Sequence, residues 1–282
     1  MNYRLQVNVV SEAQNIELHP WPVPQFQYSF SHQHGLNPGG SQERPHIHDS
    51  YEIYVNVSGD VAFLVNNRLY QVRKGDVIVS RPGDVHICVY QSDMPHERFC
   101  FWLNCPQDSP LLGFVRRDDF SNFIRFSEDT RRELLRLLYR LKAAESEGRE
   151  PARTAYVFRL LALFAEGEQT DLDRPALPKS MQQVLDYINA NFVHLHCVDD
   201  ISSATHISGS TMNRWFRTYL QLSPHKYVEA LKLSYAQKLL LEGRSVTEAC
   251  NESGFTDCSR FIAIFKSKFG RTPLQYQKNK EI

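Results

Sequence analysis

The 282-residue sequence lacks the features that mark secreted and membrane proteins. Its six cysteines include no CxxC pair and follow no secretory signal, which favours reduced thiols over a disulfide framework. No apolar stretch approaches the ~20 residues that span a bilayer, and the first residues show no signal-peptide core. We therefore expect a soluble, cytoplasmic protein with no membrane partner.

The sequence also lacks a net charge, but its charges are unevenly divided. From Lys179 onward there are 13 Lys and Arg against 9 Asp and Glu, a net of +4, whereas the preceding part has 19 against 23, a net of −4. A basic part after an acidic part is expected of a nucleic-acid-binding module attached to a sensing module. The length suits about two domains.

Residues 1–110 lack long helical periodicity and contain short apolar runs instead. Three of these runs, 51–57, 61–65 and 76–79, are separated by Gly, Pro, Asn and Asp residues. Short strands with turn residues between them predict an antiparallel sandwich or small barrel. Asn66 and Asn67 are the expected tip of a hairpin, because Asn tolerates a positive φ.

Two spaced motifs lie within this predicted barrel. An HxHxxxExxxxxxG pattern begins at His46, and residues 75–86 form a second pattern that ends at a histidine. The two resemble the cupin motifs, with one residue displaced before the proline of the second. In metal-binding cupins the matching positions hold the ion, and here they are His46, His48, Glu52 and His86.

These four residues have two interpretations. Residues two apart on a strand face the same side, so the side chains can converge inside the barrel to bind a divalent transition metal. Alternatively, they line a pocket that binds a polar effector by hydrogen bonds. We favour the effector pocket, because the displaced proline is expected to shift His86 out of register and because a regulator needs reversible binding.

The pattern becomes helical after residue 127. Ranges 128–147 and 153–165 are amphipathic and rich in leucine, which predicts packing against the barrel or a seam between two copies of the chain. Residues 166–178 are polar with two prolines and form the best linker candidate. We expect a domain at 1–168, a linker at 169–178 and a second domain at 179–282.

The second predicted domain contains two helix-turn-helix units. The first spans residues 198–217, with Ser208 as the helix cap, and the second spans 245–268 with a turn at Gly254. Most matching positions in the two units are 49 residues apart, as with Phe216 and Phe265. One long helix, 224–242, joins the units.

The C-terminal part resembles the AraC/XylS family of bacterial transcription regulators. The resemblance rests on Tyr227, Ala236, Leu239, Leu240, Gly254, Phe255, Phe261, Phe265, Lys266, Gly270, Thr272, Pro273 and Tyr276. It implies two recognition helices that enter successive major-groove segments of double-stranded promoter DNA. The implied DNA-facing residues are Ser210, Asn213, Arg214 and Arg217 in the first unit, and Cys258, Ser259, Arg260, Ile262, Ala263 and Lys266 in the second.

Side chains that can hydrogen-bond to DNA bases are concentrated in the first unit. Arg214 can pair bidentately with guanine and Asn213 with adenine. In the second unit, Ala263 replaces an arginine that is frequent in the family, so this unit is expected to hold mainly phosphates.

The leading hypothesis is a two-domain, effector-controlled regulator that acts as a homodimer, and that contacts RNA polymerase if it is an activator. A carbohydrate effector follows only by analogy with relatives, and Trp21, Tyr54, Tyr90 and Trp102 would suit one as stacking platforms, or serve equally well as core residues. The alternative is a metal-dependent cupin enzyme, an oxygenase or isomerase, with an appended helical domain. The paired helix-turn-helix units argue against it.

Overall fold

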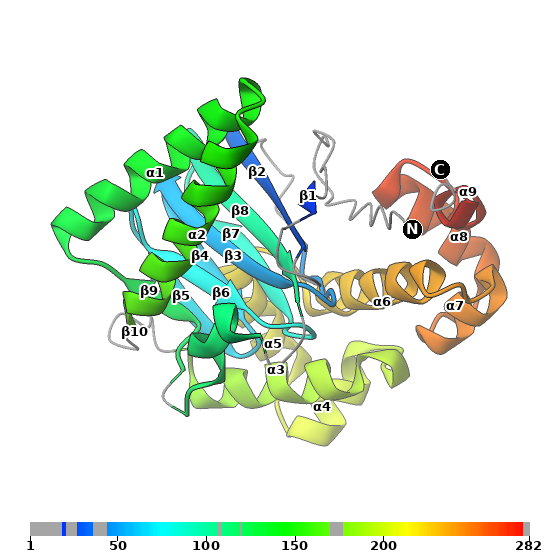
Figure 1. Cartoon of the computed structure of the whole chain (residues 1–282). Coiled ribbons are helices and arrows are strands. Elements are labelled where there is room, and N and C mark those ends of the chain that lie inside the picture. The colour runs from blue at the N-terminus through cyan, green and yellow to red at the C-terminus, as the bar shows by residue number, and fades with distance from the viewer. Residues whose placement is uncertain are drawn as a thin grey trace.

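The computed structural model describes residues 19–20, 27–35, 44–105, 109–118, 120–169 and 177–278 (Figure 1). Most strands come first, and most helices follow. The strands are β1 (His19–Pro20), β2 (Gln27–Gly35), β3 (Tyr51–Ser58), β4 (Val61–Val65), β5 (Arg68–Val72), β6 (Val77–Ser80), β7 (His86–Tyr90), β8 (His96–Asn104), β9 (Phe123–Arg125) and β10 (Glu168–Gln169). A short 3-10 helix, η1 (Pro110–Arg116), lies between β8 and β9.

The strands form two antiparallel sheets, as expected for a cupin-like barrel. The larger has the order β1-β2-β8-β3-β6-β9-β10, and the smaller has the order β5-β4-β7. Side chains from both sheets, among them Tyr54, Phe63 and Trp102, fill the space between them. The predicted hairpin tip between β4 and β5 is confirmed, with Asn66 at a φ of +53°.

The central strands are buried on both faces. Along β3, Ile53 and Val55 face outward onto helices, whereas Tyr54 faces the barrel interior. On the smaller sheet, the outward side chains of Leu64 and Ile87 belong to the core of the first helix-turn-helix unit. The C-terminal helices therefore pack directly on the barrel, which the sequence pattern did not reveal.

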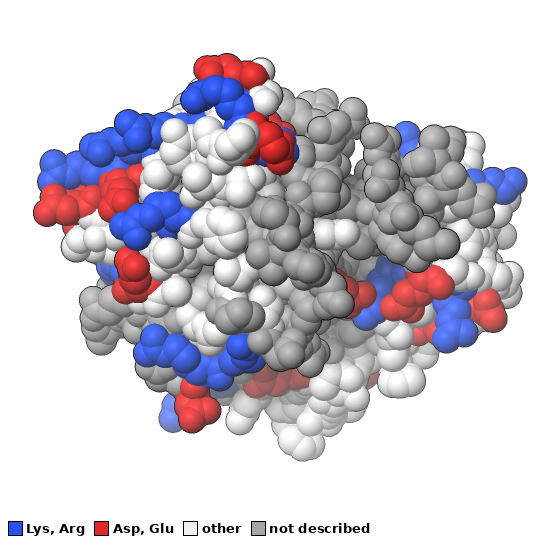
Figure 2. Space-filling model, in the orientation of Figure 1, with Lys and Arg blue, Asp and Glu red and all other residues white. Residues whose placement is uncertain are grey.

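Helices α1 (Glu128–Ser146) and α2 (Glu150–Glu166) cover the larger sheet. The leucines of α1, including Leu134, Leu138 and Leu141, are buried against that sheet within one chain. The interpretation of this stripe as a seam between two copies is therefore wrong, because those side chains already have a partner. Arg132, Arg136 and Arg140 of α1 are exposed. Figure 2 shows Lys and Arg side chains in a row along this helix.

The predicted linker differs in part from the structure. Glu168 and Gln169 pair with Arg125 and Ile124, which adds the short strand β10 to the sheet edge. Backbone hydrogen bonding to an open edge needs no apolar side-chain pattern, so the polar sequence concealed this strand. Residues 170–176, the rest of the predicted linker, lie outside the described residues.

The C-terminal half consists of helices, with bounds close to those predicted. They are α3 (Lys179–Asn191), η2 (Phe192–His194), α4 (Val198–Thr205), α5 (Gly209–Trp215), the π-helical turn η3 (Phe216–Leu220), α6 (Pro224–Leu241), α7 (Val246–Glu252), α8 (Cys258–Phe269) and α9 (Pro273–Lys278). Within the described part of the chain, none of the helices combines the length and apolar character that a membrane span requires.

Helix α6 joins the two helix-turn-helix units (Figure 1). Its Tyr227 and Leu231 pack in the core of the first unit, and its Leu233 and Leu240 pack in the core of the second. Because α6 also lies against the barrel, it is buried nearly all round rather than on one side, as Lys232 and Ser234 show.

Lys232 connects the second unit to the loop that precedes the first unit. Its Nζ donates to the Leu195 and Gly254 carbonyls, both at 2.7 Å, and the side chain is buried.

We expect Lys232→Met to lower the free energy of unfolding by about 1–3 kcal/mol, because two carbonyls lose their donor. Chemical denaturation of the full chain measures this. The exposed Lys226→Met is the control and should change stability by less than about 0.5 kcal/mol; equal effects would contradict the role of Lys232.

Candidate functional site

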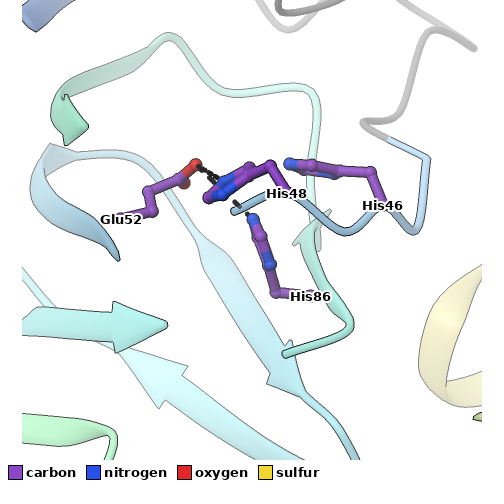
Figure 3. Close-up of side chains that lie close together, drawn as sticks. All are labelled: His46, His48, Glu52 and His86. Carbon is purple, nitrogen blue, oxygen red and sulfur yellow. Dashed lines mark hydrogen bonds and ion pairs between the residues drawn. The ribbon is translucent and has the colours of Figure 1, made fainter. Parts of the chain in front are cut away.

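Four side chains from separate parts of the barrel converge at one point (Figure 3). They are His46, His48, Glu52 and His86, and we call them the tetrad. One potential ligand atom from each lies within 4.8 Å of those of the other three. His86 and Glu52 are buried, whereas His46 and His48 are half-buried. The structure thus brings together the four residues that the two cupin-like motifs indicated.

Backbone pairing sets the positions of the tetrad. His46 and His86 exchange two backbone hydrogen bonds of 3.1 Å in an isolated β-bridge, while Glu52 lies on β3. The Gly83 amide donates to the His48 carbonyl at 2.9 Å and fixes the turn that precedes His86. The expectation that the displaced proline moves His86 out of register is therefore wrong, because this turn absorbs the displacement.

The three histidines share one tautomer. Their Nδ1 atoms lie 2.9 Å from backbone carbonyl oxygens, those of Arg44 for His46, Ser50 for His48 and Asp84 for His86. A carbonyl only accepts, so each Nδ1 carries the proton and donates it. In the neutral rings each Nε2 therefore presents a lone pair. Metal-binding histidines are commonly oriented in this way by their other ring nitrogen.

The tetrad contains an ionised carboxylate. Burial opposes ionisation of Glu52, but His86 and His48 outweigh it and hold the pKa of this carboxyl well below its usual value. Its Oε2 atom lies 3.1 Å from Nε2 of His48 and 3.4 Å from Nε2 of His86. A carboxylate and a ring lone pair repel each other at such distances unless a proton or a metal ion lies between them.

The residues fit a divalent transition metal. Burial, and then the neighbouring His86, lower the pKa of His46 well below its ordinary value, which favours the neutral form that binds metals. The Nε2 atom of His86 is buried and has no close hydrogen-bond partner among the described residues. Trp102 donates from Nε1 to Glu52 Oε2 at 2.8 Å and so orients the carboxylate. Three imidazoles and one carboxylate suit zinc, iron, nickel or cobalt.

The expected aromatic platforms are part of the barrel core. Tyr54 and Trp102 are buried, and Tyr90 packs against the same core. The hydroxyl of Tyr54 lies 2.7 Å from Nε2 of His96. Trp21 lies outside the described residues. The described aromatic side chains thus serve mainly as packing around the tetrad.

A cleft that the sequence did not indicate lies between the barrel and α3. It has a volume of about 940 Å³, and its lining includes Arg68, Arg81 and Asp84 from the barrel and Asp186 and Asn189 from α3. Nearby, Asn67 donates to the Asp186 carboxylate at 2.8 Å. Only the tertiary structure reveals this cleft, because its two walls come from segments about 100 residues apart in the sequence.

The first predicted recognition helix, α5, begins at the expected cap. The Ser208 hydroxyl accepts from the Thr211 amide at 3.3 Å. Ser210, Arg214 and Arg217 are exposed, the last of these in the turn η3 that follows α5, while Asn213 is half-buried and donates from Nδ2 to the Gly209 carbonyl at 2.8 Å. The Arg214 side chain is therefore accessible from solvent. The Asn213 amide can contact another molecule through Nδ2 only if it releases its hydrogen bond to Gly209.

The second predicted recognition helix, α8, begins after Asp257, whose Oδ1 accepts from the amides of Ser259 and Arg260. Phe261 and Phe265 are fully buried on the inner face. The remaining predicted contact residues lie outside that core: Ser259, Arg260, Ile262, Ala263 and Lys266 are exposed, and Cys258 is half-buried. An exposed isoleucine and alanine offer apolar contact rather than hydrogen bonds to bases.

Comparisons with known proteins cover both halves of the chain. The family model of an AraC-like ligand binding domain matches residues 38–161, and that of a helix-turn-helix domain matches residues 201–279. The chain is 24% identical over 250 residues to the uncharacterized HTH-type transcriptional regulator YdeC of Bacillus subtilis, covering 83% of this chain and 85% of that protein. It is 22% identical over 249 residues to the HTH-type transcriptional activator RhaS of Escherichia coli, covering 84% and 88%.

Solved structures also align with this chain. Wild-type ToxT from Vibrio cholerae, crystallised with an unsaturated fatty acid, aligns over 90% of this chain and 95% of its own, with 14% identity and a TM-score of 0.38. A probable AraC family transcriptional regulator from Rhodopseudomonas palustris aligns over 36% of this chain and 98% of its own, with 24% identity and a TM-score of 0.33.

Proposed function

Because the chain belongs to the AraC family of transcription regulators, with a ligand-binding domain and a helix-turn-helix domain, we propose that it binds promoter DNA through α5 and α8 under the control of a ligand held by the tetrad. The observation that carries this proposal is the pairing of two exposed recognition-helix faces on one connecting helix with a preorganised ligand cluster in the barrel. We further propose that it acts in the cytoplasm, where promoter DNA is located.

We propose that ligand binding and DNA binding belong to separate parts of the chain. We assign residues 1–169 to ligand binding, since Gln169 pairs with Ile124 in the barrel sheet, 170–178 to the linker and 179–282 to DNA binding. The helix boundaries support this assignment, because α2 ends at Glu166 and α3 begins at Lys179. We propose a homodimer for the intact regulator, with contacts outside the buried leucines of α1, and contact with RNA polymerase if the protein activates transcription.

The effector we propose is a divalent transition metal ion. The sequence favoured a pocket without metal, but the geometry supports the metal better. Three ring nitrogens with fixed tautomers and one carboxylate converge on one point, a donor set that suits a divalent cation. When bound, the ion supplies positive charge, and the four side chains hold it while the backbone carbonyls and Trp102 hold the side chains.

The same tetrad would also suit a metal-dependent enzyme. We propose a regulator rather than an enzyme. In support, Phe63 stacks near His86 at 6.2 Å between ring centroids, and the barrel interior beside the tetrad is filled by aromatic side chains. A bound ion needs no more room than the tetrad offers, whereas turnover requires space for a substrate.

Metal analysis of the purified full chain tests the proposed effector. Protein prepared without chelators or a histidine tag is expected to contain close to one transition-metal ion per chain. The double variant His46→Ala/His48→Ala should lose it, because half of the tetrad is removed. Low metal in the wild type after incubation with zinc and cobalt salts would contradict the proposal and leave a hydrogen-bonded organic effector.

Arg214 provides the test of DNA reading. We expect Arg214→Ala to relax the preference at one base position and to weaken binding by about 1–3 kcal/mol, the usual value of a bidentate arginine–guanine contact. Lys266→Ala, on the exposed face of α8, should weaken binding to all sequences alike, because a phosphate contact carries no base information. Selection of binding sites from a random duplex library measures both. An identical motif and affinity for wild type and Arg214→Ala would remove Arg214 from this role.

A further inference from the structure

The backbone that carries two tetrad histidines also contacts the helix that joins the two DNA-binding units. Residues 46–49, which we call the coupling segment, hold His46 and His48 at the ligand site. The residues between and beside them, Ile47 and Asp49, contact α6 instead. One extended segment thus has the ligand site on one side and the connecting helix on the other.

Ser234 makes the central contact. Its hydroxyl accepts from the Ile47 amide and donates to the Ile47 carbonyl, both at 3.0 Å, so one side chain satisfies both backbone groups of the segment. Ser234 is 2% exposed. A shift of the segment would leave these backbone groups without partners in a place that water reaches poorly, so the segment and α6 are expected to move together.

A second contact lies one helical turn further along α6. The Lys238 ammonium donates to Asp49 Oδ1 at 2.7 Å. This hydrogen bond, more than the opposing desolvation, raises the pKa of Lys238. Ser234 and Lys238 are four residues apart and therefore lie on one face of α6, toward the barrel.

Helix α6 can pass such a movement to both DNA-binding units. Leu231 belongs to the core that holds α5, and Leu233 and Leu240 belong to the core that holds α8. Closely packed cores shift as units rather than deform locally. A change in the position of Ser234 relative to the tetrad therefore alters how both recognition helices are presented.

We propose that occupancy of the tetrad by a divalent metal is transmitted to the DNA-binding helices through the coupling segment, by way of Ser234 and Lys238. This inference rests on the proposed function, since it takes the tetrad as the ligand site. His46 and His48, once drawn to a common ion, fix the segment, and the segment fixes the middle of α6. The route is short and polar and does not pass through the interdomain linker.

The test uses the full chain, Co²⁺ as the probe and a DNA duplex selected by the wild-type protein. Cobalt uptake is followed by absorption, and the Kd for DNA is measured with and without the metal. We expect the two Kd values of the wild type to differ by at least about fivefold, within the usual range of coupling between sites. By linkage, DNA should change the cobalt affinity by the same factor.

Two variants address the route. Ser234→Ala removes both hydrogen bonds to Ile47, and Lys238→Met removes the contact with Asp49 at a half-exposed position where folding is not at risk. Each should still bind cobalt, while the ratio of the DNA Kd values moves toward one. Amide exchange at Ile47 should be slow in the cobalt-bound wild type and faster in Ser234→Ala. The exposed Ser203→Ala, on α4, is the matched control and should keep the wild-type ratio.

The outcomes separate the two proposals. A wild-type chain that binds cobalt and DNA but shows a Kd ratio near one overturns the coupling and leaves the metal site intact. Variants that bind cobalt and keep the full ratio overturn the route through Ser234 and Lys238. A wild-type chain that binds DNA but takes up no cobalt overturns the metal effector itself, and the coupling with it.

Discussion

Replacement of Gly254 by alanine is expected to lower the free energy of unfolding of the full chain by at least about 3 kcal/mol. Gly254 has a φ of +82°, which strains any other residue except, at times, asparagine or aspartate. In addition, a Cβ atom there would lie 1.9 Å from the Val193 carbonyl oxygen, which belongs to the backbone of η2. The second unit would have to separate from η2 to make room.

The control for this variant is Gly243→Ala, at the end of α6. Gly243 has a φ of +95°, but a Cβ atom there would meet no other atom within 4 Å. It should therefore cost only the conformational strain, about 1–2 kcal/mol. Denaturation curves for both variants separate strain from the clash. Equal losses would show that the contact between Gly254 and Val193 is not tight in solution.

Glu52→Gln is expected to weaken metal binding by more than about 100-fold, since even changes outside the direct ligands cost 10–100-fold. The substitution keeps the size of the side chain but removes the negative charge that faces the Nε2 atoms of His48 and His86. Competition titration with cobalt and a chelator of known affinity, on the full chain, measures the change.

Two further variants complete that series. Trp102→Phe removes the donor that orients Glu52 and should weaken binding by about 10–100-fold. Asp76→Asn changes another buried carboxylate of the same barrel. Asp76 is not part of the tetrad, and its Oδ2 atom pairs with Nη2 of Arg125 at 2.9 Å. It should leave metal affinity unchanged. Loss of metal binding in Asp76→Asn equal to that in Glu52→Gln would indicate general disruption of the barrel rather than loss of a ligand.

The sequence by itself determined the local structure of this protein and the identity of its candidate residues. Apolar residues at helical spacing and the cap Ser208 placed the helices of both units close to their observed bounds, because these signals act between neighbours along the chain. The HxHxxxE spacing likewise identified three of the tetrad residues as candidates. Residues an even number of positions apart on an extended backbone point to the same side.

Only the tertiary structure decided what each surface meets. The leucines of α1 were equally suited to a barrel or to a second copy, because an apolar stripe does not name its partner. The turn at Gly83 kept His86 in the tetrad although the motif was displaced, since a backbone hydrogen bond carries no side-chain signal. In the sequence, Ser234 and Lys238 are ordinary residues of a predicted helix. Only the fold places them beside Ile47 and Asp49, almost 190 positions earlier. Contacts between distant segments depend on how whole elements pack, and no short sequence pattern encodes them.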